Sequence, residues 1–230
     1  TLTNQNVVVT ITANKEIREV SGWTLSNDKK RLTKTYTENK TETIVVTDLV
    51  GNTTTAAVVV NNINKVGPKA TIKYSTVEKT NQSVIVTITS DKEIQEIDGW
   101  VLDSSKKILT KEYTANQEET IQITDLAGNT ITAEVKIKNI DKIIPDATVK
   151  YSTVDPTNQN VIVTITTDKE IQEVEGWTLD SSKKVLTKEY AENKEEEIVI
   201  KDLAGNEIKV DIKIANIDKT KPEVNVSYSS

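Results

Sequence analysis

Three tryptophans could recognise a sugar, because a flat indole ring can stack on a pyranose face. They are Trp23, Trp100 and Trp177, and each follows a glycine. The same rings could instead fill a core, since the chain contains no Phe and a buried aromatic side chain contributes a large apolar area. We expect core tryptophans, with a carbohydrate-binding module that uses these rings as the alternative.

Paired carboxylates are the second group with possible chemistry, because calcium binds roughly six to eight oxygen atoms. Two places offer such a pair, whereas the equivalent place earlier in the chain has Asn64 and Lys69. The sequence therefore predicts no metal, with calcium as the alternative at the two later places. The candidate ligands are Asp141, Asp146, Asp218 and Glu223.

The composition excludes much enzyme chemistry. The chain has no Cys and no His, so it has no thiolate nucleophile, no imidazole base and no disulfide. Its acidic residues fall at outward strand positions and in turns, without partners that would shift their pKa. The acidic stretch from Glu195 to Glu197 is typical of a solvated strand edge. We expect no enzyme and no cofactor.

Three lysines share strand parity with apolar neighbours and should be partly buried. They are Lys34, Lys111 and Lys188. A buried lysine could form an isopeptide crosslink to a residue such as Asn139 if a carboxylate lay beside it. A lysine whose stem packs on apolar surface while its ammonium group reaches water explains the same pattern, and we favour it.

These residues recur because the chain repeats one unit with a period of 77 residues. Two motifs keep this period together with the Gly-Trp pairs. Thr-Asn-Gln begins at Thr3, Thr80 and Thr157, and Asp-Leu-x-Gly-Asn begins at Asp48, Asp125 and Asp202. The predicted repeats are 1–66, 67–143 and 144–220, followed at 221–230 by the first strand of a further repeat.

Alternating apolar and polar residues predict strands throughout. In the middle repeat Ile131, Ala133, Val135 and Ile137 alternate with Thr, Glu and Lys residues, as in a strand with one face buried and one wet. No stretch has the apolar period of a helix. The sequence predicts an all-β fold with seven strands in the middle repeat: 70–75, 83–89, 93–97, 100–103, 107–113, 120–124 and 130–138.

Seven strands with roughly 8–12-residue spacing match an immunoglobulin-type β-sandwich, with a small closed barrel as the weaker alternative. Several motifs carry a resemblance: Pro-x-Ala-Thr-Val-x-Tyr-Ser at 145–152, Thr-Asn-Gln-x-Val-x-Val-Thr-Ile-Thr from Thr157, Asp-Leu-Ala-Gly-Asn from Asp202, and Asn-Ile-Asp-Lys-Thr-x-Pro at 216–222. The set resembles the immunoglobulin-like tandem repeats of Gram-positive surface proteins and secreted multi-modular proteins. The resemblance covers all three repeats and implies display outside a bacterial cell.

The charge and hydropathy limit the partners. A net charge of −6 and a pI of about 5.0 argue against nucleic acid, and the basic residues are interspersed. No apolar run approaches the roughly 20 residues that cross a membrane. The expected partners are neighbouring repeats of the same protein, other copies arranged head-to-tail, and host or cell-wall glycan.

Proline lies in each short junction, at Pro68, Pro145 and Pro222. Proline fixes φ, so the linkers should be stiff. Three sandwiches joined end to end by such linkers would form an extended rod on the order of 100 Å long.

The boundaries of the repeats do not coincide with the two ends of the sequence. Thr1 aligns with Glu78, so the first repeat lacks the strand that opens the others. Conversely, residues 222–229 have the pattern of that opening strand, with Val224, Val226 and Tyr228 on one face. This strand could complete the first repeat of another copy by β-strand addition.

The function predicted from the sequence is a non-enzymatic structural spacer or stalk of a bacterial cell-surface or secreted protein, of the kind found in adhesins. The first alternative is a self-assembling extracellular fibre subunit linked by donation of residues 222–229. The second is the carbohydrate-binding module.

Overall fold

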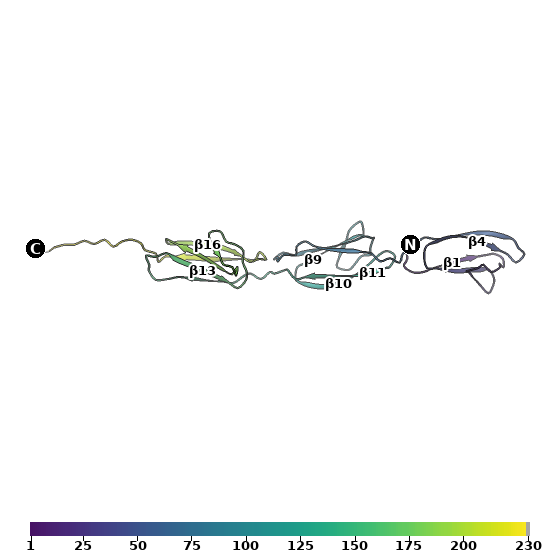
Figure 1. Ribbon diagram of the computed structural model, residues 1–230, viewed down its shortest axis with the longest axis horizontal. Coiled ribbons are helices and arrows are strands. Elements are labelled where there is room, and N and C mark those ends of the chain that lie inside the picture. Colours follow the sequence, from purple (N-terminus) through teal and green to yellow (C-terminus); the bar gives the residue numbers. More distant parts are fainter. Residues whose placement is uncertain (229–230) are drawn as a thin grey trace. The chain divides into compact units, whose positions relative to one another are not determined.

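The computed structural model describes residues 1–228 and is all-β, which confirms the predicted fold class at that level. Its strands form three similar groups of small antiparallel sheets (Figure 1). None of the described residues lies in a helix, so no helix among them is long and apolar enough to cross a membrane.

The strands follow the 77-residue period. The first repeat contains β1 (Val7–Thr12), β2 (Thr24–Leu25), β3 (Arg31–Tyr36), β4 (Lys40–Thr47) and β5 (Thr53–Val60). The second contains β6 (Ala70–Tyr74), β7 (Val84–Ser90), β8 (Val101–Leu102), β9 (Ile108–Tyr113), β10 (Gln117–Thr124) and β11 (Thr130–Ile137). The third contains β12 (Ala147–Tyr151), β13 (Val161–Thr167), β14 (Thr178–Leu179), β15 (Val185–Tyr190), β16 (Lys194–Lys201) and β17 (Glu207–Ile214).

Each of the two later repeats has a four-stranded and a two-stranded sheet. In the third repeat the orders are β12-β13-β15-β14 and β16-β17, and in the second they are β6-β7-β9-β8 and β10-β11. In the antiparallel register Ile165 lies opposite Val149 on one neighbour and Leu186 on the other. Because side chains opposite one another point to the same face, this register gathers the apolar residues on one side of the sheet.

The core of the third repeat is made by both sheets. Val163, Ile165 and Leu186 from the four-stranded sheet and Ile200 and Ile212 from the two-stranded sheet are almost fully buried in one cluster. Along each strand these residues alternate with exposed or half-buried ones, as the alternating pattern predicts. Burial of the two inner faces against each other supplies the main apolar contribution to stability.

One predicted strand is reduced to a bridge. The segment 93–97 pairs only where Ile94 bridges Asp125 in antiparallel fashion, and Ile171 bridges Asp202 in the same way in the third repeat. The chain turns directly afterwards, because Gly99 adopts a φ of 74° and the Trp100 N–H donates to the Ile97 carbonyl at 3.1 Å.

The first repeat has one strand fewer in its larger sheet. Its order is β1-β3-β2, without a counterpart of β6 or β12 beside β1 within the described residues. The inward side chains of β1, namely Val7, Val9 and Ile11, are only half-buried. Their counterparts in β7, Val84, Val86 and Ile88, are fully buried. The absent strand therefore leaves this edge of the core partly open.

Residues 219–228 form no strand and are exposed, so the predicted opening strand is unpaired here (Figure 1). The apolar residues of this segment are open to solvent: Val224 is 82%, Val226 66% and Tyr228 93% exposed. The last two residues of the predicted segment 221–230 lie outside the described residues.

The chain divides into two compact units. The first comprises Thr1–Tyr74, Ile85–Lys111 and Glu118–Lys136, and the second comprises Ser75–Val84, Glu112–Gln117 and the described residues from Ile137 onward. The division passes through the second repeat rather than between repeats.

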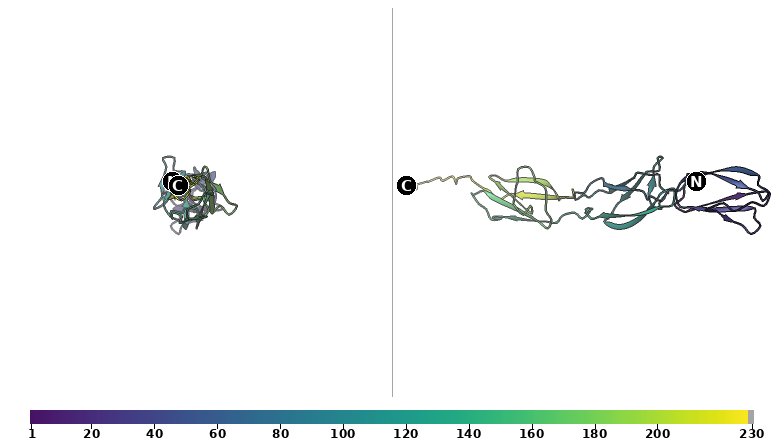
Figure 2. Two further views of the ribbon diagram at one scale, coloured as in Figure 1. Left: turned by 90° about the vertical axis from the view of Figure 1, so that its left-hand side faces the viewer. Right: turned by 45° about the vertical axis from the view of Figure 1, so that its right-hand side comes forward.

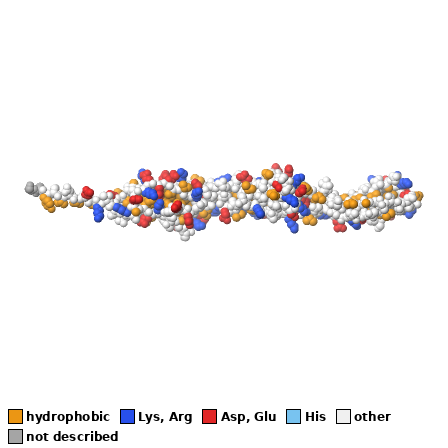
Figure 3. All heavy atoms as spheres, turned by 90° about the horizontal axis from the view of Figure 1, so that it is seen from above, with side chains coloured by type: hydrophobic (Ala, Val, Ile, Leu, Met, Phe, Trp, Pro, Cys, Tyr) orange, Lys and Arg blue, Asp and Glu red, His pale blue; other side chains and the backbone are white. Residues whose placement is uncertain are grey.

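Figure 2 gives two further views of the chain, from the purple first repeat to the yellow-green third. Acidic and basic side chains are interspersed over the face in Figure 3.

Candidate functional site

A set of three hydrogen bonds joins the first repeat to the second. The N–H of Asn4 donates to the carbonyl of Ala127 at 2.8 Å, and Nδ2 of Asn4 donates to the carbonyl of Gly128 at 2.7 Å. In the opposite direction, Nδ2 of Asn129 donates to the carbonyl of Asn64 at 2.9 Å. The Thr-Asn-Gln segment of one repeat thus holds the Asp-Leu-x-Gly-Asn loop of the next.

The same set recurs between the second and third repeats. The N–H and Nδ2 of Asn81 donate to the carbonyls of Ala204 and Gly205, both at 2.8 Å. Nδ2 of Asn206 donates to the carbonyl of Asp141 at 2.9 Å. We call this repeated set of hydrogen bonds, between the Thr-Asn-Gln segment and the Asp-Leu-x-Gly-Asn loop, the clasp.

Local hydrogen bonds orient the asparagine of the clasp. The N–H of Gln82 donates to Oγ1 of Thr80 at 3.0 Å, and Nε2 of Gln82 donates to Oδ1 of Asn81 at 2.7 Å. With its oxygen occupied in this way, the side chain of Asn81 presents Nδ2 to the neighbouring repeat, beside the backbone N–H of the same residue. Each residue of the Thr-Asn-Gln motif therefore has a distinct part in the clasp.

A buried aspartate stabilises the Asp-Leu-x-Gly-Asn loop to which the clasp asparagine donates its hydrogen bonds. Asp202 is 2% exposed, and its Oδ1 accepts from the N–H groups of Ala204 and Asn206, both at 2.9 Å. Burial disfavours its charged form, but the hydrogen bonds from Asn206 and Ala204 together with the charge of Lys169 outweigh that effect and hold the pKa of Asp202 below its ordinary value. The aspartate therefore stays ionised and keeps the loop closed.

Glycine is favoured in this loop by its backbone conformation. Gly205 adopts a φ of 91°, in the left-handed region that favours glycine. A Cβ at this position would lie 3.6 Å from Nδ2 of Asn81, an ordinary contact distance. The conformation of the backbone, rather than lack of space, therefore explains the glycine.

A lysine adds charge to each clasp. Nζ of Lys169 lies 2.9 Å from Oδ2 of Asp141 and 3.5 Å from Oδ2 of Asp202, and donates to the carbonyl of Ile143. Burial favours the neutral form of Lys169, but Asp141 and Asp202 together outweigh this and raise the pKa of the ammonium group. The lysine therefore links the junction segment to the loop aspartate.

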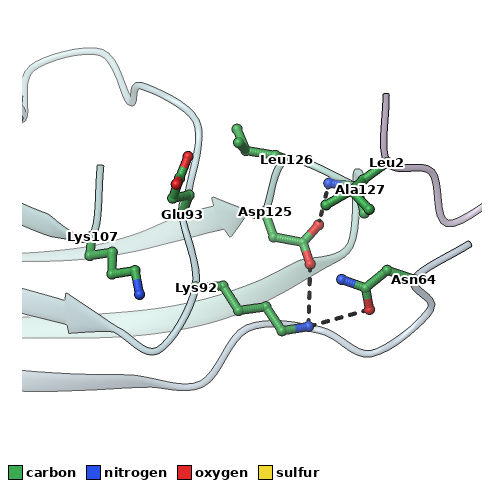
Figure 4. A pocket seen from close by; sticks show the side chains of 8 residues that line it. All are labelled: Leu2, Asn64, Lys92, Glu93, Lys107, Asp125, Leu126 and Ala127. Carbon is green, nitrogen blue, oxygen red and sulfur yellow. Dashed lines mark hydrogen bonds and ion pairs between the residues drawn. The ribbon is translucent and has the colours of Figure 1, made fainter. Parts of the chain in front are cut away.

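The first junction has the same lysine with a weaker partner. Nζ of Lys92 lies 3.7 Å from Oδ2 of Asp125 and 3.5 Å from Oδ1 of Asn64, and donates to the carbonyl of Val66 (Figure 4). Asn64 takes the place of Asp141 and brings no charge. Beside this lysine is a hollow of about 540 Å³. It is lined by Leu2, Asn64, Lys92, Glu93, Lys107, Asp125, Leu126 and Ala127.

The tryptophans lie against the cores. Trp177 packs on the core of the third repeat, 6.3 Å from the ring of Tyr190 in an edge-to-face arrangement, and Trp100 is only 8% exposed. Nζ of Lys188 lies 5.4 Å from the centroid of the Trp177 ring, a cation–π distance. One face of this ring is therefore covered by a lysine.

The three lysines of predicted intermediate burial each pair with a glutamate. Nζ of Lys34 lies 2.6 Å from Oε1 of Glu42, and the Tyr36 hydroxyl donates to the same oxygen at 2.5 Å. These two donors hold the pKa of Glu42 at about 2, and burial together with Glu42 raises the pKa of Tyr36 to about 12. The prediction that the acidic residues have no partners that shift their pKa is therefore wrong for this glutamate. Lys111 pairs with Glu119 at 2.8 Å and Lys188 with Glu196 at 2.7 Å.

The crosslink candidate Asn139 is engaged elsewhere. Its Nδ2 donates to the carbonyl of Glu78 at 2.8 Å, and it continues the pattern of Asn216, which donates to Asp155 at 2.8 Å. The lysines and this asparagine therefore have separate partners.

The candidate calcium ligands do not form a metal-binding cluster within the described residues. Asp141 pairs with Lys169, Asp146 accepts from the N–H of Ala147 at 2.9 Å, and Asp218 accepts from the N–H of Thr220 at 2.9 Å. Glu223 is exposed. Within residues 1–228 no three acidic side chains form a group that could hold a metal ion.

The acidic stretch is balanced by lysines across its strand. Glu195 lies 2.5 Å from Nζ of Lys213, and Glu197 lies 2.8 Å from Nζ of Lys209. These are exposed cross-strand ion pairs on the β16-β17 sheet, consistent with a solvated strand face.

Sequence reasoning missed the clasp, although it used both motifs to measure the period. The available signal was chemical. Asn, Gln, Asp and Gly are kept at the same loop positions in all three repeats, whereas outward strand residues vary between Thr, Glu and Gln. Polar loop residues kept in every copy indicate a contact that every copy makes or could make.

No family model matches this sequence, and no curated protein matches it.

Proposed function

We propose that the chain is a non-enzymatic spacer of a bacterial cell-surface or secreted protein, built from immunoglobulin-like β-sandwich repeats. The observation that carries this proposal is the clasp. The same three hydrogen bonds join the first repeat to the second and the second to the third. The polar groups kept in every copy thus serve the connection between repeats rather than a reaction.

The strand order supports an immunoglobulin-like sandwich. In the constant-type immunoglobulin domain, one sheet contains the first, second, fifth and fourth strands, and the other the third, sixth and seventh. If the Ile171 bridge is counted as the third strand, the third repeat has the first set as β12-β13-β15-β14. The bridge then joins the end of β16, the sixth strand, and β16 pairs with β17, the seventh.

The clasp would limit bending between neighbouring repeats. Each hydrogen bond contributes a net stabilisation of about 0.5–1.5 kcal/mol, and bonds that converge from both sides oppose rotation as well as separation. The junction prolines Pro68 and Pro145 are buried and fix the backbone between the repeats. A connection of this kind suits a stalk that holds a functional domain at a distance from the cell or from a catalytic module.

Small-angle X-ray scattering at low concentration tests this function. An unclasped array bends more, so the double variant N4A/N81A should have a smaller radius of gyration than the wild-type chain. The wild type should have a maximum dimension on the order of 100 Å. The matched control is N158A, which changes the same motif in the third repeat. A compact wild-type particle, or a double variant that scatters like the wild type, would contradict the spacer.

A second candidate function is a self-assembling extracellular fibre subunit joined by strand donation. Two observations favour it: the half-buried core residues of β1, and the unpaired segment with exposed Val224 and Val226. An added strand at the free edge of β1 would gain backbone hydrogen bonds and bury apolar side chains.

Static light scattering of the chain with and without residues 222–230 tests strand donation. The mass of the complete chain should rise with concentration, and that of the shortened chain should stay at the monomer value. The variant V224S/V226S keeps the length and should weaken association, because it loses the apolar side chains. Equal masses for the complete and shortened chains would rule the donation out.

A further inference from the structure

Each repeat is closed by a short parallel bridge between its start and its end. In the second repeat Thr80 pairs in parallel with the segment 139–141. Its N–H donates to the carbonyl of Asn139, and its carbonyl accepts from the N–H of Asp141, both at 2.9 Å. Both bonds recur in the first and third repeats, at 2.8–2.9 Å. We call this pairing the closing bridge.

Two asparagine side chains reinforce the closing bridge. Nδ2 of Asn139 donates to the carbonyl of Glu78 at 2.8 Å, so the end segment is joined to the start of the repeat a second time. Oδ1 of Asn116 accepts from the N–H of Ile140, and Nδ2 of Asn116 donates to the carbonyl of Ile140, both at 2.9 Å. The third repeat has the same bonds, made by the asparagines one period later.

An isoleucine anchors the end segment of each closing bridge. Ile63, Ile140 and Ile217 are each only 7–8% exposed, and Ile63 and Ile217 belong to the apolar cores of their repeats. The end segment cannot slide along the start segment without drawing this side chain out of the core. Burial also keeps water from replacing a hydrogen bond at the moment it breaks.

The closing bridge encloses most strands of the repeat in one loop of sequence. In the second repeat β7 to β11 all lie between Thr80 and Ile140, and only β6 lies outside. Tension along the chain can therefore pass directly from Thr80 to the end segment. The strands inside the loop are stretched only after the bridge has opened.

The parallel direction decides how the closing bridge responds to tension. A pull on the chain draws the start segment towards lower residue numbers and the end segment towards higher ones. For two parallel segments these are opposite directions along one line, so all the bonds are strained at once. An antiparallel hairpin such as β16-β17, pulled apart at its open end, would instead lose its bonds one after another. Bonds that must break together resist a larger force.

The closing bridge and the clasp use neighbouring groups. The N–H of Asp141 donates within the bridge, while its carbonyl accepts from Nδ2 of Asn206 in the clasp. Asn81, which donates to the carbonyl of Ala204 in the clasp, directly follows Thr80 of the bridge. Tension can therefore pass from one repeat to the next through adjacent hydrogen bonds.

We propose that this chain bears tension, and that the closing bridge is the element of each repeat that resists unfolding when the chain is pulled along its length. The inference goes beyond the spacer function, which requires only that two parts be held apart. A chain that bears tension suits a protein whose two ends are attached to bodies that move relative to one another.

Single-molecule force spectroscopy of the whole chain tests this proposal. Because the chain has no Cys, V66C/K221C attaches one handle before the second repeat and one after the third. Pulling should give a separate unfolding event for each of the two repeats. Each event should lengthen the chain by about 200 Å, since the closed loop holds roughly 60 residues of about 3.3–3.6 Å each.

Two variants of this chain separate the closing bridge from the core. N139A/N216A removes a side-chain bond of the bridge from both repeats under tension. At a fixed force it should raise the unfolding rate about 2–10-fold, as expected when one hydrogen bond is lost from the barrier. The control I88V/I165V shortens a fully buried side chain inside both closed loops and should change this rate less than about 2-fold. Urea unfolding measures the equilibrium stability that each variant loses.

Two results would overturn the proposal. If the two variants speed unfolding under tension in proportion to their losses of equilibrium stability, the core and not the closing bridge limits unfolding. If the wild-type chain lengthens gradually without separate events, it does not bear tension. Neither result would affect the spacer function, because the scattering test of that function applies no tension.

Discussion

At the scale of single residues, the repeated polar groups are structural. Glu42, Glu119 and Glu196 each accept from a lysine that packs across the repeat's tryptophan, and the Tyr36 and Tyr190 hydroxyls add a second donor. In part-buried ion pairs of this kind, the attraction between a lysine on one strand and a glutamate on another depends on the glutamate being ionised. They predict a definite response to acid.

Lowering the pH should destabilise the chain as these glutamates protonate. The pKa of Glu42 and that of Glu196 are about 2 in the folded chain, and an unfolded glutamate has a pKa of about 4.3. Because the folded pKa is depressed, the contribution is fully present above the unfolded value and is lost as the pH falls from about 4.3 towards 2. Thermal unfolding followed by circular dichroism should show the melting temperature falling across this window.

The variant E42Q/E119Q/E196Q should have a flatter dependence of melting temperature on pH over this window. The control E195Q/E197Q changes exposed glutamates and should keep the wild-type slope. If both variants keep that slope, the three glutamates are not responsible for the acid response.

The loop aspartates should differ in their effect on stability according to burial. Asp202 accepts several hydrogen bonds and is 2% exposed, so D202A should lower the free energy of unfolding by about 2–4 kcal/mol, since buried donors lose their acceptor. D48A makes the same change in the uncovered loop and should lower the free energy of unfolding by less, because water can replace the lost acceptor there. Urea unfolding measures both, and equal losses would contradict the role of the neighbouring repeat in burying the loop.

At the scale of elements, the alternating pattern was enough to predict most strands. The predicted ranges 70–75, 107–113 and 130–138 agree with β6, β9 and β11 to within a residue at each end. The range 93–97 was too long because only Ile94 forms a bridge, and residues 95–97 lead into the turn at Asp98 and Gly99. β10 begins at Gln117, earlier than predicted, because a strand on a wet face can pair without apolar residues.

The site was harder to predict than the strands. Periodicity identifies which residues face a core, but a contact between repeats depends on how one loop lies against another. The Thr-Asn-Gln and Asp-Leu-x-Gly-Asn motifs were visible in the sequence, whereas their pairing across the junction was not. Lys92 and Lys169 recur with Lys15 at the 77-residue period, but the period does not indicate that they pair with the loop aspartates.

Tryptophan fluorescence tests how the rings lie against the core. With Trp100 nearly buried and Trp177 packed on its core, emission should occur at the short wavelengths typical of buried indole and should not respond to added oligosaccharide. Acrylamide should quench it weakly. Emission at long wavelength that shifts when glycan is added would instead support the carbohydrate-binding alternative.

At the scale of the whole molecule, the 77-residue period sets both the fold and the connections. The Thr-Asn-Gln segments of the first and second repeats bind the Asp-Leu-x-Gly-Asn loops of the second and third repeats, respectively. This arrangement explains why the compact units cross the second repeat, since Ser75–Val84 is grouped with the third repeat whose loop Asn81 holds. Further repeats could be added to such a chain through the same hydrogen bonds.

The most direct test of the account is a distance distribution between spin labels on the second and third repeats. The chain has no Cys, so V101C/T178C places labels only at two equivalent exposed strand positions. Pulsed electron–electron double resonance at low concentration should give one narrow distribution of label-to-label distances. N81A should broaden this distribution, and N158A should leave it unchanged. A broad distribution in the otherwise unchanged chain, or a narrow one that N81A does not affect, would contradict the claim that the clasp holds neighbouring repeats together.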